Sequence, residues 1–257
     1  MIMDEILSYL DVFLLVFVRM GALLWMNPIF SRKNIPMMAR VGLVFSVSLL
    51  LAPLQDGAAV AALEPTDMVL AMIRELGIGL LMGMVFQIYY YMLYVAGDLL
   101  DTVFGLSMAK VMDPVSSVQA STWGQMLNVL FVLYFFATGS HLVMIKLFAY
   151  SYEVVPVGAY MILLPRVTAY VLTLFHSVFI LVAKLALPFV AAEFILEAAM
   201  GILMKLIPQI HVFVINLQTK IAAGILLMML FAQPLGEFID RYVVSLMEDM
   251  QKVLTLF

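Results

Sequence analysis

Residues Asp98 to Gln125 read DLLDTVFGLSMAKVMDPVSSVQASTWGQ. Before them lies a run of 22 residues without a charge, Leu76 to Gly97, and after Asp113 the next ionised residue is Lys146. The stretch itself carries four charged side chains, at Asp98, Asp101, Lys110 and Asp113. Each would cost about 2.5–3.5 kcal/mol at the centre of a bilayer, so the stretch is not expected to face lipid. Irregular backbone at membrane depth is tolerated only where protein covers it or water fills a cavity. Two interpretations follow from the residues alone: a water-exposed loop between spans, or a loop that lines a pathway.

The composition is that of an integral membrane protein. Of 257 residues, 65% are hydrophobic and 12% are charged, and the mean hydropathy is +1.12; soluble proteins have about 25% charged residues. The 13 Lys and Arg against 17 Asp and Glu give a net charge of −4, and no cluster of cations is large enough to hold phosphates. Nucleic acid is therefore not expected as a partner. The absence of cysteine excludes disulfides, thiol catalysis and cysteine metal sites.

Six apolar segments predict an all-α, polytopic membrane protein. Residues 11–30, 41–54, 68–97, 126–148, 167–192 and 210–231 are the expected helices. About 20 residues cross a bilayer, so the second segment is marginal and fits a re-entrant or protein-buried helix equally well. The stretch from Glu193 to Lys205, between the last two helices, is charged but compatible with a helix. From Glu237 to Lys252, apolar residues recur among charges at a spacing that predicts a surface amphipathic helix.

Several ionisable residues lie within these apolar segments. Arg19, Lys184 and Lys220 fall inside predicted spans, and Glu193 and Glu197 are one helical turn apart. Like charges at that spacing repel, so an opposite charge is expected near the two glutamates. Intramembrane charges usually face protein or a water pathway and carry function. The alternative is a structural ion pair between this chain's own helices, for example Glu197 with Lys220.

Catalytic signatures are missing from the sequence. No two of the three histidines are close enough to form a helical metalloprotease motif with a glutamate between them, and a phosphate-binding loop is absent. The glycines of GIGLLMG, Gly77 to Gly83, lie within an apolar helix, where small residues favour close helix packing. We therefore expect no enzymatic activity and no cofactor or metal.

A set of residues that follow one another in a characteristic order extends along nearly the whole chain. Its first part comprises Arg19, Pro28, Phe30, Pro36, Arg40, Pro53 and the run ELGIGLLMG from Glu75. Its centre comprises Ala96-Gly97, Asp101, Gly105, Ser107-Met108-Ala109 and Met112-Asp113-Pro114. Its last part comprises the GSHL run from Gly139, then Pro188, Glu197, Gly201, Lys205, Pro208-Gln209 and Val212-Phe213. In this order and spacing the chain resembles the FliR family of flagellar export-gate proteins and its injectisome counterparts in type III secretion. Two positions depart from the family pattern: Gln218 replaces a usual proline, and His211 replaces a common asparagine.

The resemblance implies an architecture and a set of partners. Residues 1–166 would form a FliP-like helical part that includes a plug loop at 98–125, and residues 167–257 a FliQ-like helical hairpin with an amphipathic tail. Such proteins form a helical pore for unfolded export substrates with FliP-like and FliQ-like membrane subunits, and an FlhB-like switch protein is a further expected partner. The implied location is the bacterial inner membrane, in the flagellar basal body.

The resemblance also implies two groups of functional residues, and it changes the interpretation of the central stretch from a water-exposed loop to a pore plug. The plug group is Phe104, Gly105, Met108, Met112, Asp113, Pro114, Ser116 and Ser117. Gly105 and Pro114 would fix the fold of the loop, Asp113 would hold it by hydrogen bonds, and the methionines would help to fill the channel. The second group consists of charges in contacts between subunits or within the assembly: Arg19, Glu75, Asp101, Glu193, Glu197, Lys205 and Lys220. Neighbouring subunits would supply charges opposite to Glu193, Glu197 and Lys205.

The main alternative is a small secondary transporter or channel, suggested by charges within discontinuous helices. A transporter predicts two internally similar halves, whereas the two halves of this chain differ in their number of predicted helices. It would also bind a small solute when purified alone. The export interpretation predicts instead that the chain copurifies with two other membrane proteins.

Overall fold

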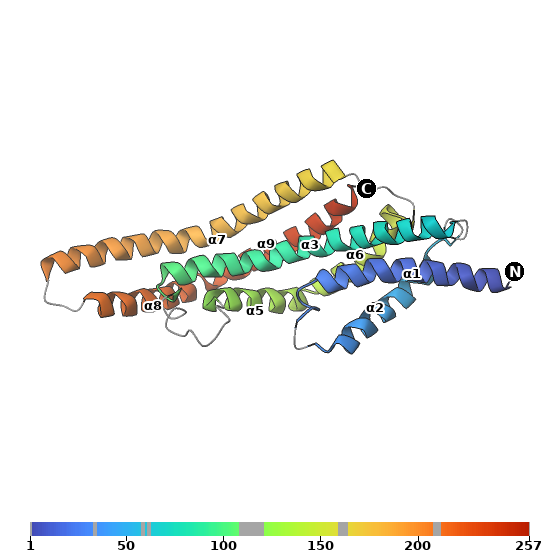
Figure 1. Cartoon of the computed structure of the whole chain (residues 1–257). Helices are drawn as coiled ribbons and strands as arrows, with labels where there is room; N and C mark the ends of the chain where they lie inside the picture. Colours follow the sequence, from blue (N-terminus) through green and yellow to red (C-terminus); the bar gives the residue numbers. More distant parts are fainter. Residues whose placement is uncertain are drawn as a thin grey trace. The chain divides into compact units, whose positions relative to one another are not determined.

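The computed structural model describes residues 2–32, 35–57, 60, 63–107, 121–158, 164–207 and 212–256 (Figure 1). Every regular element among them is helical, which confirms the predicted all-α class. In chain order the elements are α1 (Ile2–Met26), α2 (Met37–Leu51), the short 3-10 helix η1 (Ala52–Leu54), α3 (Pro65–Val103), α5 (Thr122–Ala137), α6 (Ser140–Val154), α7 (Leu164–Leu206), α8 (Val212–Leu230) and α9 (Ala232–Leu254).

The helices have the length and composition of membrane spans. Among the described residues, four segments can cross a bilayer: Tyr9–Met26, Met37–Leu54, Pro65–Val103 and Pro165–Leu206. Two bent pairs, α5 with α6 and α8 with α9, raise the number to six if each pair is one span. The chain is therefore a polytopic membrane protein with four to six spans, in agreement with the predicted number of about six.

Two predicted segments differ from the observed helices. The single helix expected over residues 126–148 is two helices, α5 and α6, which are separated by residues 138–139. Gly139, just before α6, has a φ of +73°, a left-handed conformation that glycine adopts without steric cost. In contrast, α7 continues for 43 residues through Pro188 and through the charged stretch that precedes Lys205.

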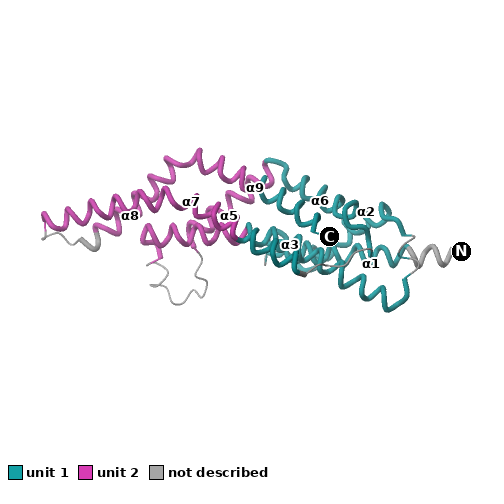
Figure 2. The backbone as a smooth tube through the Cα atoms, turned by 90° about the horizontal axis from the view of Figure 1, so that it is seen from above, with its two compact units in different colours: residues 1–89, 138–175, 244–257 teal, residues 90–137, 176–243 magenta. Residues whose placement is uncertain are grey.

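The chain forms two compact units, drawn in teal and magenta in Figure 2. Unit 1 comprises residues 1–89, 138–175 and 244–257, and unit 2 comprises residues 90–137 and 176–243. Helices α3, α7 and α9 contribute residues to both units. The predicted boundary between a FliP-like part and a FliQ-like part, at residues 166 and 167, rests on the family resemblance and not on contacts. It stays a prediction.

Close packing of α1 on α3 in unit 1 depends on two glycines of the GIGLLMG run. A Cβ atom on Gly79 would overlap the carbonyl oxygen of Arg19, and one on Gly83 would overlap the side chain of Met26. The packing role predicted for these small residues is therefore present in the structure.

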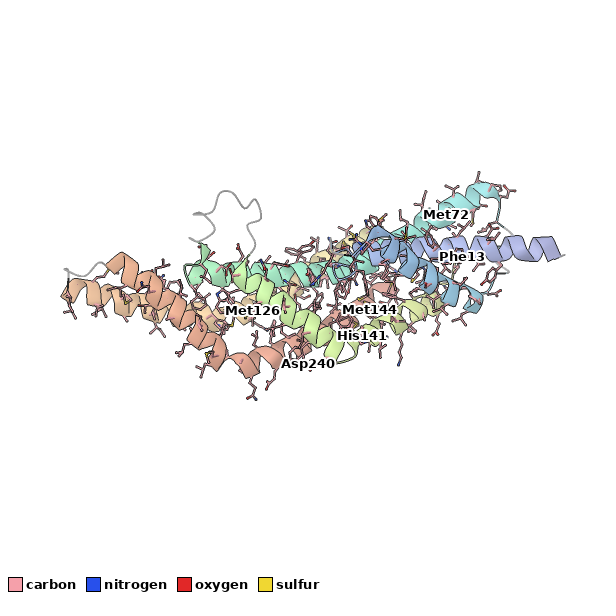
Figure 3. All side chains as sticks on the ribbon, turned by 90° about the horizontal axis from the view of Figure 1, so that it is seen from below. Phe13, Met72, Met126, His141, Met144 and Asp240 are labelled. Carbon is pink, nitrogen blue, oxygen red and sulfur yellow. The ribbon has the colours of Figure 1, made fainter. Side chains whose placement is uncertain are left out.

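The amphipathic helix predicted from Glu237 to Lys252 is α9. Its apolar face is buried within the protein: Ile239, Tyr242 and Val243 in unit 2, and Leu246 and Met250 in unit 1, are at most 1% exposed. The exposed side of the helix carries Asp240, which is labelled in Figure 3. The apolar face of this helix is thus covered by the chain itself.

Candidate functional site

The central stretch is described at its two ends. Phe104 and Gly105 of the predicted plug group lie among the described residues. The other members, Met108, Met112, Asp113, Pro114, Ser116 and Ser117, lie outside them. The described contacts of the stretch are therefore those at the end of α3 and at the start of α5. Both places belong to unit 2. We call the set formed by Gly97, Asp101, Phe104, Ser121, Trp123 and Gly124 the loop base.

Asp101 joins the two ends of the stretch. Its side chain is fully buried, and its carboxylate accepts hydrogen bonds from the backbone N–H groups of Thr122, at 2.8 Å, and Trp123, at 3.1 Å. These are the first N–H groups of α5, which an α-helix leaves without partners and where the helix dipole favours a negative charge. The hydroxyl of Ser121 accepts a third hydrogen bond, from the N–H of Gly124 at 2.9 Å. The start of α5 is thereby fixed to the last turns of α3.

The backbones of α3 and α5 also touch at a pair of glycines. A Cβ atom on Gly97 would overlap the backbone of Gly124. A Cβ on Gly124 would lie 2.9 Å from the side chain of Ser121 and 3.1 Å from the ring of Tyr94. Only residues without side chains allow this approach, and it brings Asp101 within reach of α5.

Phe104 anchors the beginning of the stretch inside the protein. Its side chain is fully buried, and its ring centroid lies 6.2 Å from that of Trp123 and 6.4 Å from that of Phe189. On α8, a Cβ atom at Gly224 would lie 2.8 Å from the ring, so this glycine provides the space that the ring occupies. Phe104 belongs to the loop base, and its predicted role in the plug stays a prediction.

Gly105 marks the end of α3. Its φ of +76° is left-handed, which is common where a helix ends in glycine. A Cβ here would lie 2.9 Å from a methyl group of Leu217 and 4.0 Å from Cδ of Lys220, both on α8. The first residue beyond Phe104 therefore rests on α8, next to a charged side chain. The predicted role of Gly105 in shaping the loop itself stays a prediction.

The side chain of Lys220 belongs to an ion cluster between α7 and α8, which we call the Lys220 cluster. Figure 1 draws the two helices side by side. Nζ of Lys220 lies 2.8 Å from an oxygen of Glu193 and 3.2 Å from an oxygen of Glu197. Glu193 is 4% exposed, whereas the side chain of Glu197 is 55% exposed. The pair proposed from the sequence, Glu197 with Lys220, is present, and Glu193 shares the same lysine. One cation between two carboxylates leaves a net charge of −1. Lys205, the third residue of α7 in the predicted group of assembly charges, is exposed.

A second charge cluster lies in unit 1. Arg19 is fully buried on α1, and Glu75 on α3 is 1% exposed. Nε of Arg19 donates to one carboxylate oxygen of Glu75, and Nη2 donates to the other at 3.1 Å. The N–H of Gly158 also donates to Glu75, at 3.1 Å. The geometry is that of a bidentate arginine–carboxylate pair, which is stronger and more specific than a single contact.

The remaining donors of Arg19 reach the end of α6. Nη1 donates to the carbonyl oxygen of Ser151 at 3.1 Å and to its hydroxyl at 3.3 Å, and Nη2 donates to the carbonyl oxygen of Val155 at 3.0 Å. The guanidinium carbon lies 4.1 Å from the centre of the Tyr152 ring, a cation–π contact. A cation is favourable at a helix C-terminus, where the last carbonyl groups lack partners. Arg19 thus joins α1, α3 and α6 within one unit.

Sequence reasoning selected Arg19, Glu75 and Asp101 as functional charges but did not pair the first two or connect the third to α5. It missed Ser121 and Gly224, since a serine before a helix and a glycine in an apolar helix are common. The only signal for the first pair was a single Arg within the first apolar segment and a Glu, next to Arg74, near the start of the third. No group of three or more potential metal ligands occurs within the described part of the chain.

Comparisons with known proteins show similarity along nearly the whole chain. The family model for bacterial export proteins, family 1, matches residues 10–246. The flagellar biosynthetic protein FliR of Bacillus subtilis is 28% identical, with 99% of this chain and 98% of the relative covered. FliR of Escherichia coli K12 is 26% identical, with 98% and 97% covered. The Yop proteins translocation protein T of Yersinia pestis is 25% identical, with 96% of both chains covered.

Proposed function

Because the chain belongs to the bacterial export proteins, family 1, and is a component of a type III export apparatus, we propose that residues 98–125 plug a protein-conducting pore that the chain forms with FliP-like and FliQ-like membrane subunits. The observation that carries this proposal is the hydrogen bonding of buried Asp101 to the first N–H groups of α5. The charged stretch between these anchors cannot face lipid, and both of its ends are fixed inside unit 2.

A fixed base is what a seal requires. A loop that only connects two spans can be held loosely, because water satisfies its backbone groups. A loop that blocks ions must keep one position against thermal motion. The buried cap at Asp101, the glycine contact at Gly97 and the enclosed ring of Phe104 all restrain the chain where the stretch begins or ends. These three restraints support a plug over a solvent-exposed connection.

The proposed mechanism involves transport without chemistry on the substrate. Unfolded protein would displace the stretch from the channel while the loop base stays in place. Gly105 is the first residue beyond buried Phe104 and has a left-handed backbone, so it is suited to act as the hinge. The sequence contains no nucleotide-binding motif, and we propose that energy comes from other parts of the apparatus.

The remaining partners follow from the same proposal. The excess negative charge of the Lys220 cluster, and Lys205 further along α7, would pair with charges of neighbouring subunits. Residues 1–166 would be the FliP-like part and residues 167–257 the FliQ-like part. An FlhB-like protein would complete the gate in the inner membrane of a flagellar basal body. We propose a flagellar system, in line with the relatives named for flagellar biosynthesis.

Deletion of residues 111–119 tests the plug. We expect cells that express the shortened chain together with its companion subunits to show a higher ion leak across the membrane. The reason is that the pore would lose the residues that block it, while the loop base stays intact. The measurement is membrane permeability to ions. Copurification of the companion subunits provides the control for assembly. Permeability at the wild-type level in an assembled complex would rule out the plug.

A further inference from the structure

The Lys220 cluster and the space that holds the Phe104 ring are formed by consecutive turns of the same two helices. On α7, Phe189 lies against the ring, and Glu193 follows one turn later. On α8, Gly224 leaves room for the ring, and Lys220 precedes it by one turn. Residues four apart are neighbours on one face of a helix. The ion cluster therefore lies directly beside the ring that anchors the loop base.

Lys220 also borders the first residue beyond that ring. A Cβ atom on Gly105 would lie 4.0 Å from Cδ of Lys220, while Nζ of the same side chain lies 2.8 Å from Glu193. The aliphatic part of a lysine side chain can pack against the protein while its charged tip is engaged elsewhere. A displacement of Lys220 away from Glu193 would therefore also change the support of the chain at Gly105.

Apolar packing between α7 and α8 becomes sparse at the level of the Lys220 cluster. From Phe194 to the end of α7, Met200 is the one buried residue, and Phe194 itself is 68% exposed. On α8, no residue from Ile215 to Ala223 is buried. Apolar contacts stabilise in proportion to the area that they bury. Attraction between charges is thus the main described contact that holds the two helices together at this level.

Glu193 depends on Lys220 because its carboxylate is buried. The residue is 4% exposed, and apart from its ion pair with Lys220 the carboxylate has no hydrogen-bond partner in the described part of the chain. A buried charge without a partner is costly, so separation of the two residues is opposed. Glu197, whose side chain is 55% exposed, is already solvated and contributes less to this attraction.

We infer that Glu193 and Lys220 are positioning residues for the plug. Their ion pair holds α7 and α8 together around Phe104, and it thereby keeps the loop base in the position in which residues 98–125 block the pore. This inference rests on the proposed function of that stretch. It adds that the seal depends on two charges outside the stretch, on helices that follow it in the chain. When the pair is broken, α7 and α8 separate and Phe104 loses the walls that enclose it.

Ion leak across membranes that contain the assembled complex tests the inference. Glu193→Gln keeps the shape of the side chain and leaves Lys220 paired with Glu197, so the chain should still fold. The leak should rise about tenfold, the effect of about 1.4 kcal/mol on the equilibrium between sealed and open forms. Lys220→Met should raise the leak at least as much. Lys220→Arg keeps the cation and should seal like wild type.

Two further variants show whether the pairing of charges is the cause. The exchange of Glu193→Lys together with Lys220→Glu restores an ion pair between α7 and α8, and it should recover most of the seal. Lys184→Gln removes an exposed cation from α7 and should leave the leak unchanged. Copurification of the companion subunits shows that each variant assembles, and Glu193→Gln decides the test if Lys220→Met does not assemble.

Fluorescence of Trp123 in the purified full-length chain reports on the loop base directly. The chain has two tryptophans, so Trp25→Phe leaves Trp123 alone, with its ring centroid 6.2 Å from that of Phe104. Trp123 is 8% exposed. In this background we expect Glu193→Gln to increase the quenching of Trp123 by acrylamide, while the helix content measured by circular dichroism stays at the wild-type level.

The outcomes separate this inference from the plug itself. A sealed complex with Glu193→Gln, beside a leaking complex with residues 111–119 deleted, would overturn the inference and leave the plug in place. If the deletion were sealed as well, the plug would be wrong, and the inference with it. Equal leaks from Lys220→Arg and Lys220→Met would show that the charge is not the cause, and unchanged quenching of Trp123 would show that the loop base does not move. Either result would overturn the inference.

Discussion

Replacing Arg19 by methionine is expected to lower the free energy of unfolding by about 3–5 kcal/mol, the usual effect of breaking a buried ion pair. The change leaves the carboxylate of Glu75, at 1% exposure, without its guanidinium. It also removes the donors to the carbonyl oxygens of Ser151 and Val155. Three helices lose their common contact. The measurement is denaturant unfolding of the purified full-length chain in detergent.

A double variant shows whether the loss comes from the uncompensated charge. Arg19→Met with Glu75→Met removes both charges, and it should recover much of the lost stability, because replacing a whole buried pair by apolar residues is often close to neutral. Arg166→Met, at an exposed position of the same unit, should change stability by less than about 0.5 kcal/mol. If the single and double variants were equally unstable, the uncompensated carboxylate would not be the cause.

Gly97→Ala should destabilise the chain by about 3 kcal/mol, the upper part of the range for overpacking in a core. The new methyl group would overlap the backbone of Gly124, which cannot rotate away as a side chain can. Separation of α3 from α5 would also draw Asp101 away from the N–H groups that it caps. The same unfolding assay provides the measurement.

Gly201→Ala is the matched control for this change. Both glycines are inside long helices, but a Cβ on Gly201 meets nothing within 4 Å in the chain. Alanine should therefore stabilise that position by about 0.5–1 kcal/mol through backbone entropy alone. The two substitutions are thus expected to change stability in opposite directions. A stabilising effect of Gly97→Ala would show that the two helices do not meet at the loop base.

Much of the fold could be predicted from the sequence because its signals are local. Uncharged runs of about 20 residues indicate spans, and the apolar spacing after Glu237 indicates a helix. The break at Gly139 was missed because a single glycine within a helical pattern costs only about 1 kcal/mol and does not decide whether the helix continues. The glycine at the end of α3 was selected through the family resemblance, and its left-handed backbone became visible only in the structure.

The candidate site was less predictable because its contacts join distant parts of the chain. Asp101 could be chosen as an unusual charge, but its capping role depends on where α5 begins, 21 residues later. Glu75 and Arg19 are 56 residues apart and lie on different helices. The Lys220 cluster was partly predictable, because two glutamates one turn apart require a cation and few lysines lie in the spans.

Cross-linking of a stalled substrate tests the central proposal most directly. The chain contains no cysteine, so Met112→Cys introduces a unique thiol within the proposed plug. Leu133→Cys, at a 58% exposed position on α5, provides a control thiol. In an assembled apparatus with an export substrate halted by a folded domain and carrying its own cysteine, we predict a cross-link from residue 112 and none from residue 133. The absence of a cross-link at residue 112, while the halted substrate is protected from protease within the apparatus, would contradict a plug in the path of the exported chain.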